Sequence, residues 1–165
     1  MIYTLDNFFE NIDIVKEELF AQKFYTCENH PEYINNKNKW PGERTAELYD
    51  KELTKVLTNN LGRLKLNILN GALMQTYGHL RVNDSDDWIH TDNTTASGLI
   101  YINNDNLKSG TLFYNNKKEI VQDVKYVENR LVIFTSQYPH KAYGHFGDNI
   151  YNGRVTINLF FKNYE

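Results

Sequence analysis

The chain has 165 residues, of which 41% are hydrophobic and 14% aromatic, and its formal net charge is −3. This length and composition predict a single domain, residues 1–165, with a packed core, and they exclude a disordered chain. Acidic and basic residues are interspersed without a long basic run, which argues against a nucleic-acid partner. No run of about eighteen apolar residues occurs, so we expect no membrane span.

Cys27 is the only cysteine, so no disulfide can form within the chain and a reducing compartment is expected. Residues 1–6 lack a basic region followed by an apolar run, and we therefore expect no secretory signal. The heavy use of Asn, Lys, Ile and Tyr is typical of AT-rich genomes, including those of many phages. The expected location is cytoplasmic, and a phage-encoded protein acting in the host cytosol is one interpretation.

Two helices are predicted in the first part of the chain. Asp6 can cap a helix over residues 8–20, whose apolar face is Phe8, Phe9, Ile12, Val15, Leu19 and Phe20. Residues 27–44 are polar and contain two prolines, which favours an extended loop. Thr45 can cap a second helix that ends near Gly62 and carries Leu48, Tyr49, Leu53, Val56 and Leu57.

After Gly62 the apolar residues alternate with polar ones, which indicates strands. The expected strands are 64–68, 72–80, 88–92, 97–103, 111–115, 120–126, 130–135, 140–143 and 154–162. This order predicts a mostly β (α+β) protein, with a double-sheet jelly roll over about residues 63–162. The N-terminal helices, within about residues 1–62, would buttress it.

The triplet His90-Thr91-Asp92 is a candidate metal site. Residues i and i+2 of a strand point to the same face, so His90 and Asp92 can bind one ion together. With His140 they form two histidines and one carboxylate, the facial triad of non-haem Fe(II) oxygenases. Zinc also accepts these ligands. The alternative interpretation is a strand with a buried, hydrogen-bonded His90 and a turn that begins at Asp92.

The last predicted strand carries polar residues on an inward face. Arg154, Thr156 and Asn158 share that face with Phe160, while Val155, Ile157, Leu159 and Phe161 share the other. An arginine and a threonine inside a barrel are costly without a partner. The carboxylate of a ligand would satisfy both, and the arginine would bind it in a bidentate salt bridge.

The remaining histidines and the tryptophans have simpler interpretations. His145 is a rival third ligand, but Gly144-His145-Phe146-Gly147 is typical of a loop, so His140 is favoured. His30 and His79 have no carboxylate at metal spacing and are predicted at the surface or at the edge of the core. Trp40 and Trp88 are expected to be packing anchors, and the alternative is that they line a substrate entrance.

From Ala72 to Phe161 the chain resembles the Fe(II)/2-oxoglutarate-dependent oxygenases, in particular their prolyl-4-hydroxylase-like branch. The shared motifs are His90-Thr91-Asp92, Tyr101-Ile102-Asn103, Ser109-Gly110-Thr111-Leu112, Asn129-Arg130-Leu131-Val132-Ile133-Phe134, Pro139-His140 and Arg154-Val155-Thr156. Their order and spacing together are far more specific than the metal triplet alone.

The resemblance implies a double-stranded β-helix, another name for the jelly roll. It implies that His90, Asp92 and His140 bind Fe(II) and that Arg154 holds the distal carboxylate of 2-oxoglutarate. Tyr101 and Thr156 would add hydroxyl contacts to the same cosubstrate, and Tyr77 or Gln75 another polar contact. An inward Tyr101 also has the alternative role of filling space. Fe(II), 2-oxoglutarate and O2 are the implied cofactors and cosubstrates, with ascorbate as a reductant.

The implied reaction is hydroxylation of an amino-acid side chain with release of succinate and CO2. The first expectation for the substrate is a prolyl residue of a peptide or protein. A small molecule or free amino acid is the second, and a non-catalytic jelly-roll binding module with a vestigial metal site is the third. Asp92 favours hydroxylation, because halogenating relatives replace this carboxylate with a small residue. A nucleic-acid demethylase is disfavoured, because Phe160 stands where such relatives place a second arginine.

Overall fold

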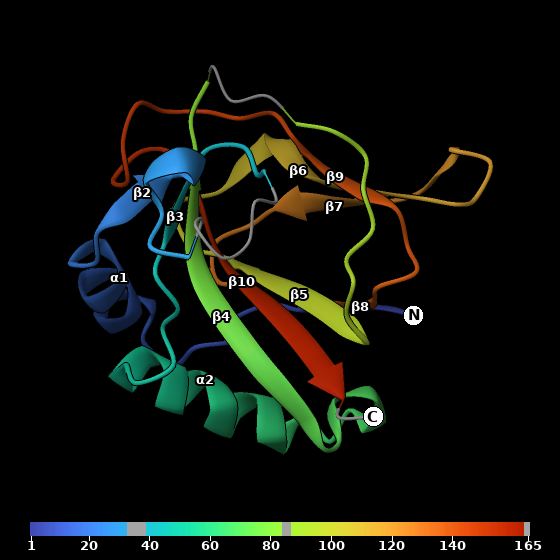
Figure 1. The fold of residues 1–165 in the computed structure, drawn as a ribbon, viewed down its shortest axis with the longest axis horizontal. Helices are drawn as coiled ribbons and strands as arrows, with labels where there is room; N and C mark the ends of the chain where they lie inside the picture. The colour runs from blue at the N-terminus through green and yellow to red at the C-terminus, as the bar shows by residue number, and fades with distance from the viewer. Residues whose placement is uncertain (33–38, 84–86, 164–165) are drawn as a thin grey trace.

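The computed structural model describes residues 1–32, 39–83 and 87–163, which form two antiparallel β-sheets and two α-helices. The strands of the larger sheet are, in spatial order, β1 (Ile2–Leu5), β8 (Leu131–Thr135), β5 (Ala96–Tyr101), β10 (Arg154–Asn163), β4 (Ala72–Arg81), β3 (Glu43–Thr45) and β2 (Phe24–Thr26). The smaller sheet is β7 (Ile120–Tyr126), β6 (Asn106–Tyr114) and β9 (His140–Tyr143). The predicted jelly roll is confirmed (Figure 1).

The helices α1 (Ile12–Phe20) and α2 (Glu52–Arg63) lie on the side of the large sheet away from the small one (Figure 1). Their buried leucines Leu19 and Leu57 pack in one hydrophobic cluster with Ile157 and Leu159 of β10. A second cluster lies between the sheets and includes Tyr101, Phe113 and Phe134. The large sheet therefore has one face against the helices and the other toward the small sheet.

Strand β10 is central and sets the register of the site. Thr156 is opposite His79 of β4 on one side and Tyr101 of β5 on the other. The predicted alternation along this strand is present. Val155, Ile157 and Leu159 belong to the helix-side cluster, while the side chains of Thr156 and Asn158 line the space between the sheets.

The first helix begins later than predicted. Its N-cap is Asn11, whose side chain accepts a hydrogen bond from the Ile14 amide at 3.3 Å. Asp6 does not cap it and instead binds the guanidinium of Arg130, with Oδ1 2.5 Å from Nε. The aromatic residues Phe8 and Phe9 precede the helix and are buried.

The second helix also begins later than predicted. Thr45 lies in β3, and the N-cap position of α2 is Lys51, which makes no side-chain capping hydrogen bond. The carboxylate of Glu18 in α1 accepts the amides of Glu52 and Leu53 at 2.9 and 2.6 Å. A long-range contact therefore performs the capping, and the proposed cap at Thr45 is wrong because that residue pairs in a sheet.

Two of the predicted strands are wrong. Residues 64–68 follow α2: Leu64 is the C-cap position of the helix, Lys65 has a left-handed φ of 50°, and the 3-10 turn η2 (Asn67–Leu69) begins at Asn67. Residues 88–92 form no strand, and only His90 makes an isolated bridge, to His140. The predicted loop 27–44 begins with the 3-10 turn η1 (Cys27–Asn29) and ends in β3, while its residues 33–38 lie outside the described part.

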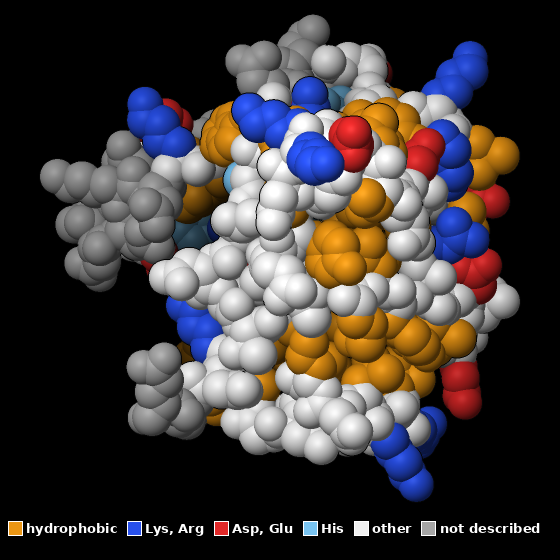
Figure 2. All heavy atoms as spheres, turned by 90° about the vertical axis from the view of Figure 1, so that its right-hand side faces the viewer, with side chains coloured by type: hydrophobic (Ala, Val, Ile, Leu, Met, Phe, Trp, Pro, Cys, Tyr) orange, Lys and Arg blue, Asp and Glu red, His pale blue; other side chains and the backbone are white. Residues whose placement is uncertain are grey.

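The surface carries charges of both signs. On the face shown in Figure 2, hydrophobic side chains form a band across the lower half, and Lys and Arg lie close to Asp and Glu along the margin. Within residues 1–32, 39–83 and 87–163, no helix is long and apolar enough to cross a membrane.

Candidate metal centre

The backbone holds His90 and His140 opposite each other. The amide of His90 donates to the carbonyl of His140 at 3.1 Å, and the amide of His140 donates to the carbonyl of His90 at 2.9 Å. Their ring centroids are 4.4 Å apart. Two histidines distant in sequence are thus placed side by side by a pair of main-chain hydrogen bonds, one at the start of β9 and the other in the segment before β5.

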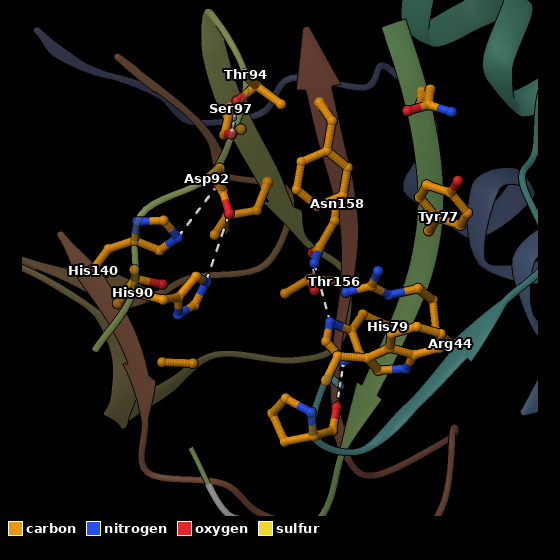
Figure 3. A pocket seen from close by; sticks show the side chains of 18 of the residues that line it. Arg44, Tyr77, His79, His90, Asp92, Thr94, Ser97, His140, Thr156 and Asn158 are labelled. Carbon is orange, nitrogen blue, oxygen red and sulfur yellow. Dashed lines mark hydrogen bonds and ion pairs between the residues drawn. The ribbon is translucent and has the colours of Figure 1, made fainter. Parts of the chain in front are cut away.

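Asp92 faces both rings (Figure 3). Its Oδ1 is 3.7 Å from Nε2 of His90, and its Oδ2 is 3.6 Å from Nε2 of His140. One donor atom from each residue lies within 4.8 Å of the others. A metal ion bound roughly 2.1 Å from each donor needs donor separations of about 3 Å, which small side-chain rotations would reach.

Both rings are oriented by the carbonyl two residues earlier. Nδ1 of His90 is 3.0 Å from the Trp88 carbonyl, and Nδ1 of His140 is 3.0 Å from the Tyr138 carbonyl. A carbonyl only accepts, so each Nδ1 carries the proton and each Nε2 keeps its lone pair toward Asp92. This is the arrangement that supports metal-binding histidines, and the three residues therefore fit a divalent transition metal.

Apolar packing keeps His140 neutral. Burial beside Phe134, whose ring centroid is 4.7 Å away, lowers the pKa of His140, and the carboxylate of Asp92 partly offsets this. A neutral imidazole is the form that binds metals. His140 is thus available as a ligand at neutral pH.

The rival histidine His145 is not part of this cluster. Its Nε2 lies 3.9 Å from Oδ2 of Asp87. Burial, together with the charges of Arg154 and Arg81, lowers the pKa of His145 to about 4. Of the two candidates for the third ligand, the structure places His140 with His90 and Asp92.

His30 and His79 are buried rather than at the surface or core edge, so that prediction is wrong. His30 bonds to the carbonyl of Thr45 at 2.7 Å and accepts the amide of Glu32. His79 donates from Nε2 to the carbonyl of Pro41 at 2.7 Å and accepts from Asn158 at Nδ1. Complete burial lowers the pKa of His79 well below its usual value, so its ring is neutral.

Arg154 is buried, with 3% of its surface exposed. Its Nη2 donates to the Gly110 carbonyl at 3.0 Å and to Oγ1 of Thr111 at 3.4 Å, while its Nε has no hydrogen-bond partner in the described part of the chain. Within the described residues it forms no ion pair with a carboxylate. A buried guanidinium with a free N–H matches the carboxylate-binding role expected of it.

Tyr101 lies in the same cluster as Arg154. Its ring centroid is 5.7 Å from the Arg154 guanidinium carbon, and its hydroxyl contacts Oγ1 of Thr111 at 2.9 Å and the Val124 carbonyl at 3.2 Å. Thr156, opposite Tyr101 on β10, donates to Oδ1 of Asn158 at 2.7 Å. The structure therefore groups Arg154, Tyr101 and Thr111, with Thr156 next to them.

Tyr77 and Gln75 lie elsewhere. Tyr77 is opposite Asn158 and Gln75 is opposite Phe160, whereas Arg154 is opposite Arg81. Tyr77 is thus four residues along the sheet from Arg154, roughly 13 Å at the rise of a strand. Its hydroxyl donates to Oε2 of Glu32 at 3.0 Å. The structure does not bring these two side chains to the Arg154 cluster.

Sequence reasoning missed four inward polar residues: Arg44, His79, Arg81 and Thr111. Arg81 forms a buried ion pair with Asp87, and burial lowers the pKa of Arg81 to about 10. The signal for His79 and Arg81 was the alternation along β4, in which residues 75, 77, 79 and 81 share the face that lines the pocket.

The metal cluster, Arg154 and the inward residues of β4 line one cavity of about 530 Å³ between the sheets, whereas the fully buried Tyr101 is not among its lining residues. The metal cluster forms one wall, and β4 and β10 form the wall opposite (Figure 3). This volume is in the range of pockets that bind small molecules.

No family model and no curated protein matches the chain. Solved structures do match: a prolyl-4-hydroxylase from Pseudomonas putida has a TM-score of 0.66 at 15% identity, covering 99% of this chain and 93% of that one. HygX from Streptomyces hygroscopicus, solved with nickel, 2-oxoglutarate and hygromycin B bound, has a TM-score of 0.71 at 10% identity, covering 98% and 82%. A viral collagen prolyl hydroxylase from Paramecium Bursaria Chlorella virus-1 has a TM-score of 0.61 at 10% identity, covering 99% and 96%.

The chain therefore has the fold of the Fe(II)- and 2-oxoglutarate-dependent oxygenases. The prolyl-hydroxylase-like arrangement implied by the sequence resemblance is confirmed at the level of the fold. Identities of 10–15% carry the architecture only, so the chemistry has to be argued from the residues of this chain.

Proposed function

We propose that this protein is an Fe(II)- and 2-oxoglutarate-dependent oxygenase that hydroxylates an amino-acid side chain and releases succinate and CO2. The first candidate substrate is a prolyl residue in a peptide or protein. The observation that carries the proposal is the pairing of two sites in one cavity. A His–Asp–His cluster lines one part of it, and the buried Arg154, with an unused N–H, lines another.

In this proposal His90, Asp92 and His140 hold Fe(II) through Nε2, a carboxylate oxygen and Nε2. When bound, the iron together with 2-oxoglutarate and O2 supplies the oxidising chemistry. The protein's own part is to fix the ligands and keep the site dry. The Trp88 and Tyr138 carbonyls fix the rings, and Phe134 shields His140 from water.

Arg154 would bind the distal carboxylate of 2-oxoglutarate, with its Nε as an open donor. The hydroxyl of Thr111, which contacts the same guanidinium, would add a hydrogen bond to the carboxylate. The hydroxyl of Tyr101 donates to the Val124 carbonyl and contacts Oγ1 of Thr111, so Tyr101 would position Thr111 beneath the cosubstrate. Thr156 is two residues from Arg154 on the same face of β10, and its hydroxyl donates to Asn158. Tyr77, at the other end of the cavity, is better placed to contact the primary substrate than the cosubstrate.

A small carboxylate-bearing molecule or free amino acid is the second candidate substrate. The observation that favours it is a further arginine, Arg44, which lines the cavity with its Nε buried and makes no ion pair within the described residues. An internal prolyl residue would leave this cation without a partner.

The test is succinate formation from 2-oxoglutarate in the presence of Fe(II) and O2. We expect wild-type protein to form succinate slowly without substrate, and Arg154→Gln or His90→Ala to abolish this. Arg63→Gln, an exposed arginine at the end of α2, is the matched control and should retain wild-type rates. Metal binding without any turnover of 2-oxoglutarate would instead support the non-catalytic binding module.

A further inference from the structure

Arg44 is an inward-facing cation that the charges of Asp92 and Glu32 reach without a direct ion pair among the described residues. It stands on the short strand β3, and its Nε is buried and has no hydrogen-bond partner among residues 1–32, 39–83 and 87–163. Within the described residues its guanidinium forms no hydrogen bond or ion pair, whereas Arg81, the next arginine in the cavity, is paired with Asp87. Burial lowers the pKa of Arg44. Such a group is costly unless something binds it.

Aromatic rings surround Arg44 without using its N–H groups. Its guanidinium carbon lies 4.5 Å from the ring centroid of Trp40, 5.4 Å from that of Tyr77 and 5.9 Å from that of Phe160. Stacking of this kind contacts the faces of the guanidinium and leaves its edge open to a planar anion. Nε1 of Trp40 is a second buried donor for which the described residues offer no partner. Two neighbouring side chains thus offer unused donors.

The segment that carries these donors is fixed to the sheet. Arg44 pairs with His79 of β4, and His79 donates to the carbonyl of Pro41. Gly42 has a φ of +72°, and a Cβ there would lie 2.3 Å from the carbonyl oxygen of Leu80, so only glycine allows this close approach. The positions of Trp40 and Arg44 are therefore set before any ligand arrives.

Arg44 faces the metal cluster across the cavity. Figure 3 shows its guanidinium directed into the pocket from the wall opposite His90, Asp92 and His140. Asp92 is near enough for its charge to raise the pKa of Arg44. Arg44 is also separate from Arg154. The Arg44 side chain extends toward Tyr77, which is opposite Asn158, and toward Phe160. Along β10, Asn158 is four residues and Phe160 six residues from Arg154.

We infer that Arg44, together with Trp40, binds a carboxylate of the primary substrate. This inference rests on the proposed oxygenase function and, among its candidate substrates, favours a molecule with a free carboxylate over an internal prolyl residue. The two oxygens of a carboxylate match the open edge of a guanidinium in a bidentate pair. The carboxylates of Glu32 and Glu47 lie near the same end of the cavity, and both raise the pKa of Tyr77. Because these negative charges repel an anion, they disfavour a doubly charged phosphate at Arg44 more than a singly charged carboxylate.

The substrate carboxylate would anchor one end of the molecule at Arg44 and leave the remainder to reach the metal. A salt bridge that holds the substrate at a fixed distance from the metal also fixes which of its C–H bonds faces the metal. An internal prolyl residue carries no charge and would not use this anchor. The carboxylate belongs either to a free acid or to the C-terminus of a peptide, and the test separates these sources.

The test is calorimetric titration of the protein loaded with Fe(II) and 2-oxoglutarate in the absence of oxygen. The probes are the twenty common L-amino acids, their α-amides, and glycyl dipeptides that end in each amino acid. At least one free acid should bind, with its α-amide roughly tenfold to a hundredfold weaker. Binding of the dipeptide as tightly as of the free acid would assign the carboxylate to a peptide C-terminus.

Arg44→Gln should weaken the bound acid roughly tenfold or more and erase its preference over the amide, while the affinity for 2-oxoglutarate stays at the wild-type value. Arg63→Gln is the control and should bind the acid normally. Should Arg44→Gln not fold, the wild-type comparison of acid with amide still decides. Equal binding of acids and amides, or no binding of any acid by protein that does bind 2-oxoglutarate, overturns the inference. Failure to bind 2-oxoglutarate at all would overturn the proposed function instead.

Discussion

At the scale of single residues, the key side chains of the site each use one polar atom for a structural hydrogen bond and leave another polar atom for a ligand. The Nδ1 atoms of His90 and His140 are occupied by carbonyls, so their Nε2 atoms converge on Asp92. Arg154 uses Nη2 for the Gly110 carbonyl and keeps Nε free. In each case one polar atom fixes the side chain and the other remains available, which is how a preorganised binding site differs from a satisfied core contact.

Asp92→Asn should weaken binding of a divalent metal strongly, because the amide removes the only anionic ligand of the three. We expect a loss of roughly a hundredfold or more in affinity, since even outer-sphere partners of metal ligands contribute 10–100-fold. Titration with Fe(II) or Mn(II) under anaerobic conditions measures it. Asp13→Asn, an exposed carboxylate in the first turn of α1, should bind metal as the wild type does. Equal metal affinity in the two variants would exclude Asp92 as a ligand.

At this scale the sequence predicted the residues that lie on regular strands or in a short motif. Arg154 begins a clearly alternating strand, so its inward direction followed from the period. His90 and Asp92 were found from their short motif, although the strand expected to carry them does not form and His90 makes only an isolated bridge to His140. Arg44 could not be found in this way. It stands in a segment that is polar throughout, and its direction is set by pairing with β4 and by the close approach of Gly42.

Secondary-structure elements position the site through long-range contacts that local patterns do not encode. The alternation of residues 64–68 matched a strand, yet Lys65 adopts a left-handed conformation and the segment turns toward β4. The start of α2 is set by the carboxylate of Glu18 from α1 rather than by a local cap. The short strand β1 was missed, because its four residues gain their pairing only from β8.

Gly78 of β4 tests how tightly the sheet packs on the helices. A Cβ at Gly78 would lie 2.7 Å from Cδ1 of Leu19 and 2.9 Å from Cγ2 of Thr45. Gly78→Ala should therefore lower the free energy of unfolding by about 1–3 kcal/mol. Gly62→Ala is the matched control: it lies in α2 with nothing within 4 Å of the added Cβ. It should raise stability by about 0.5–1 kcal/mol, because alanine favours helix over glycine.

Urea denaturation measures both changes. A neutral or stabilising effect of Gly78→Ala would contradict the close contact of β4 with α1 and β3. The opposite signs expected of the two variants separate local packing from a general effect of replacing glycine.

At the scale of the whole molecule, the metal cluster and Arg154 share one cavity because the two faces of the large sheet differ in character. The helices cover one face through Leu19 and Leu57, and this apolar packing leaves the other face free to carry polar side chains. The jelly roll and its helical buttress could be predicted from the order of periodic segments, since two helices followed by many short strands have few packing solutions. The loops that close the cavity could not be predicted from the sequence, because their positions depend on contacts between distant segments.

The stability of the whole molecule should depend on pH through His145. The pKa of His145 is lowered to about 4 by burial and nearby arginines, whereas in the unfolded chain it has its ordinary value near 6.5. The unfolded state therefore takes up a proton as the pH falls below about 6.5, and the folded state does not until about pH 4. Stability present above pH 6.5 is progressively lost over this range.

His145→Gln should remove this part of the loss. Between pH 7 and pH 5 the wild type should lose up to about 2 kcal/mol more of its unfolding free energy than the variant does. Urea denaturation of both proteins at the two pH values measures the difference. Parallel losses in the two proteins would show that His145 titrates normally in the folded state.

The most direct test of the central claim is calorimetric titration of 2-oxoglutarate into the protein without oxygen, with and without Fe(II). The account predicts one molecule bound per chain, binding that requires the metal, and a loss of roughly tenfold or more in Arg154→Gln but none in Arg63→Gln. No binding in the presence of metal, or binding that Arg154→Gln leaves unchanged, would contradict it.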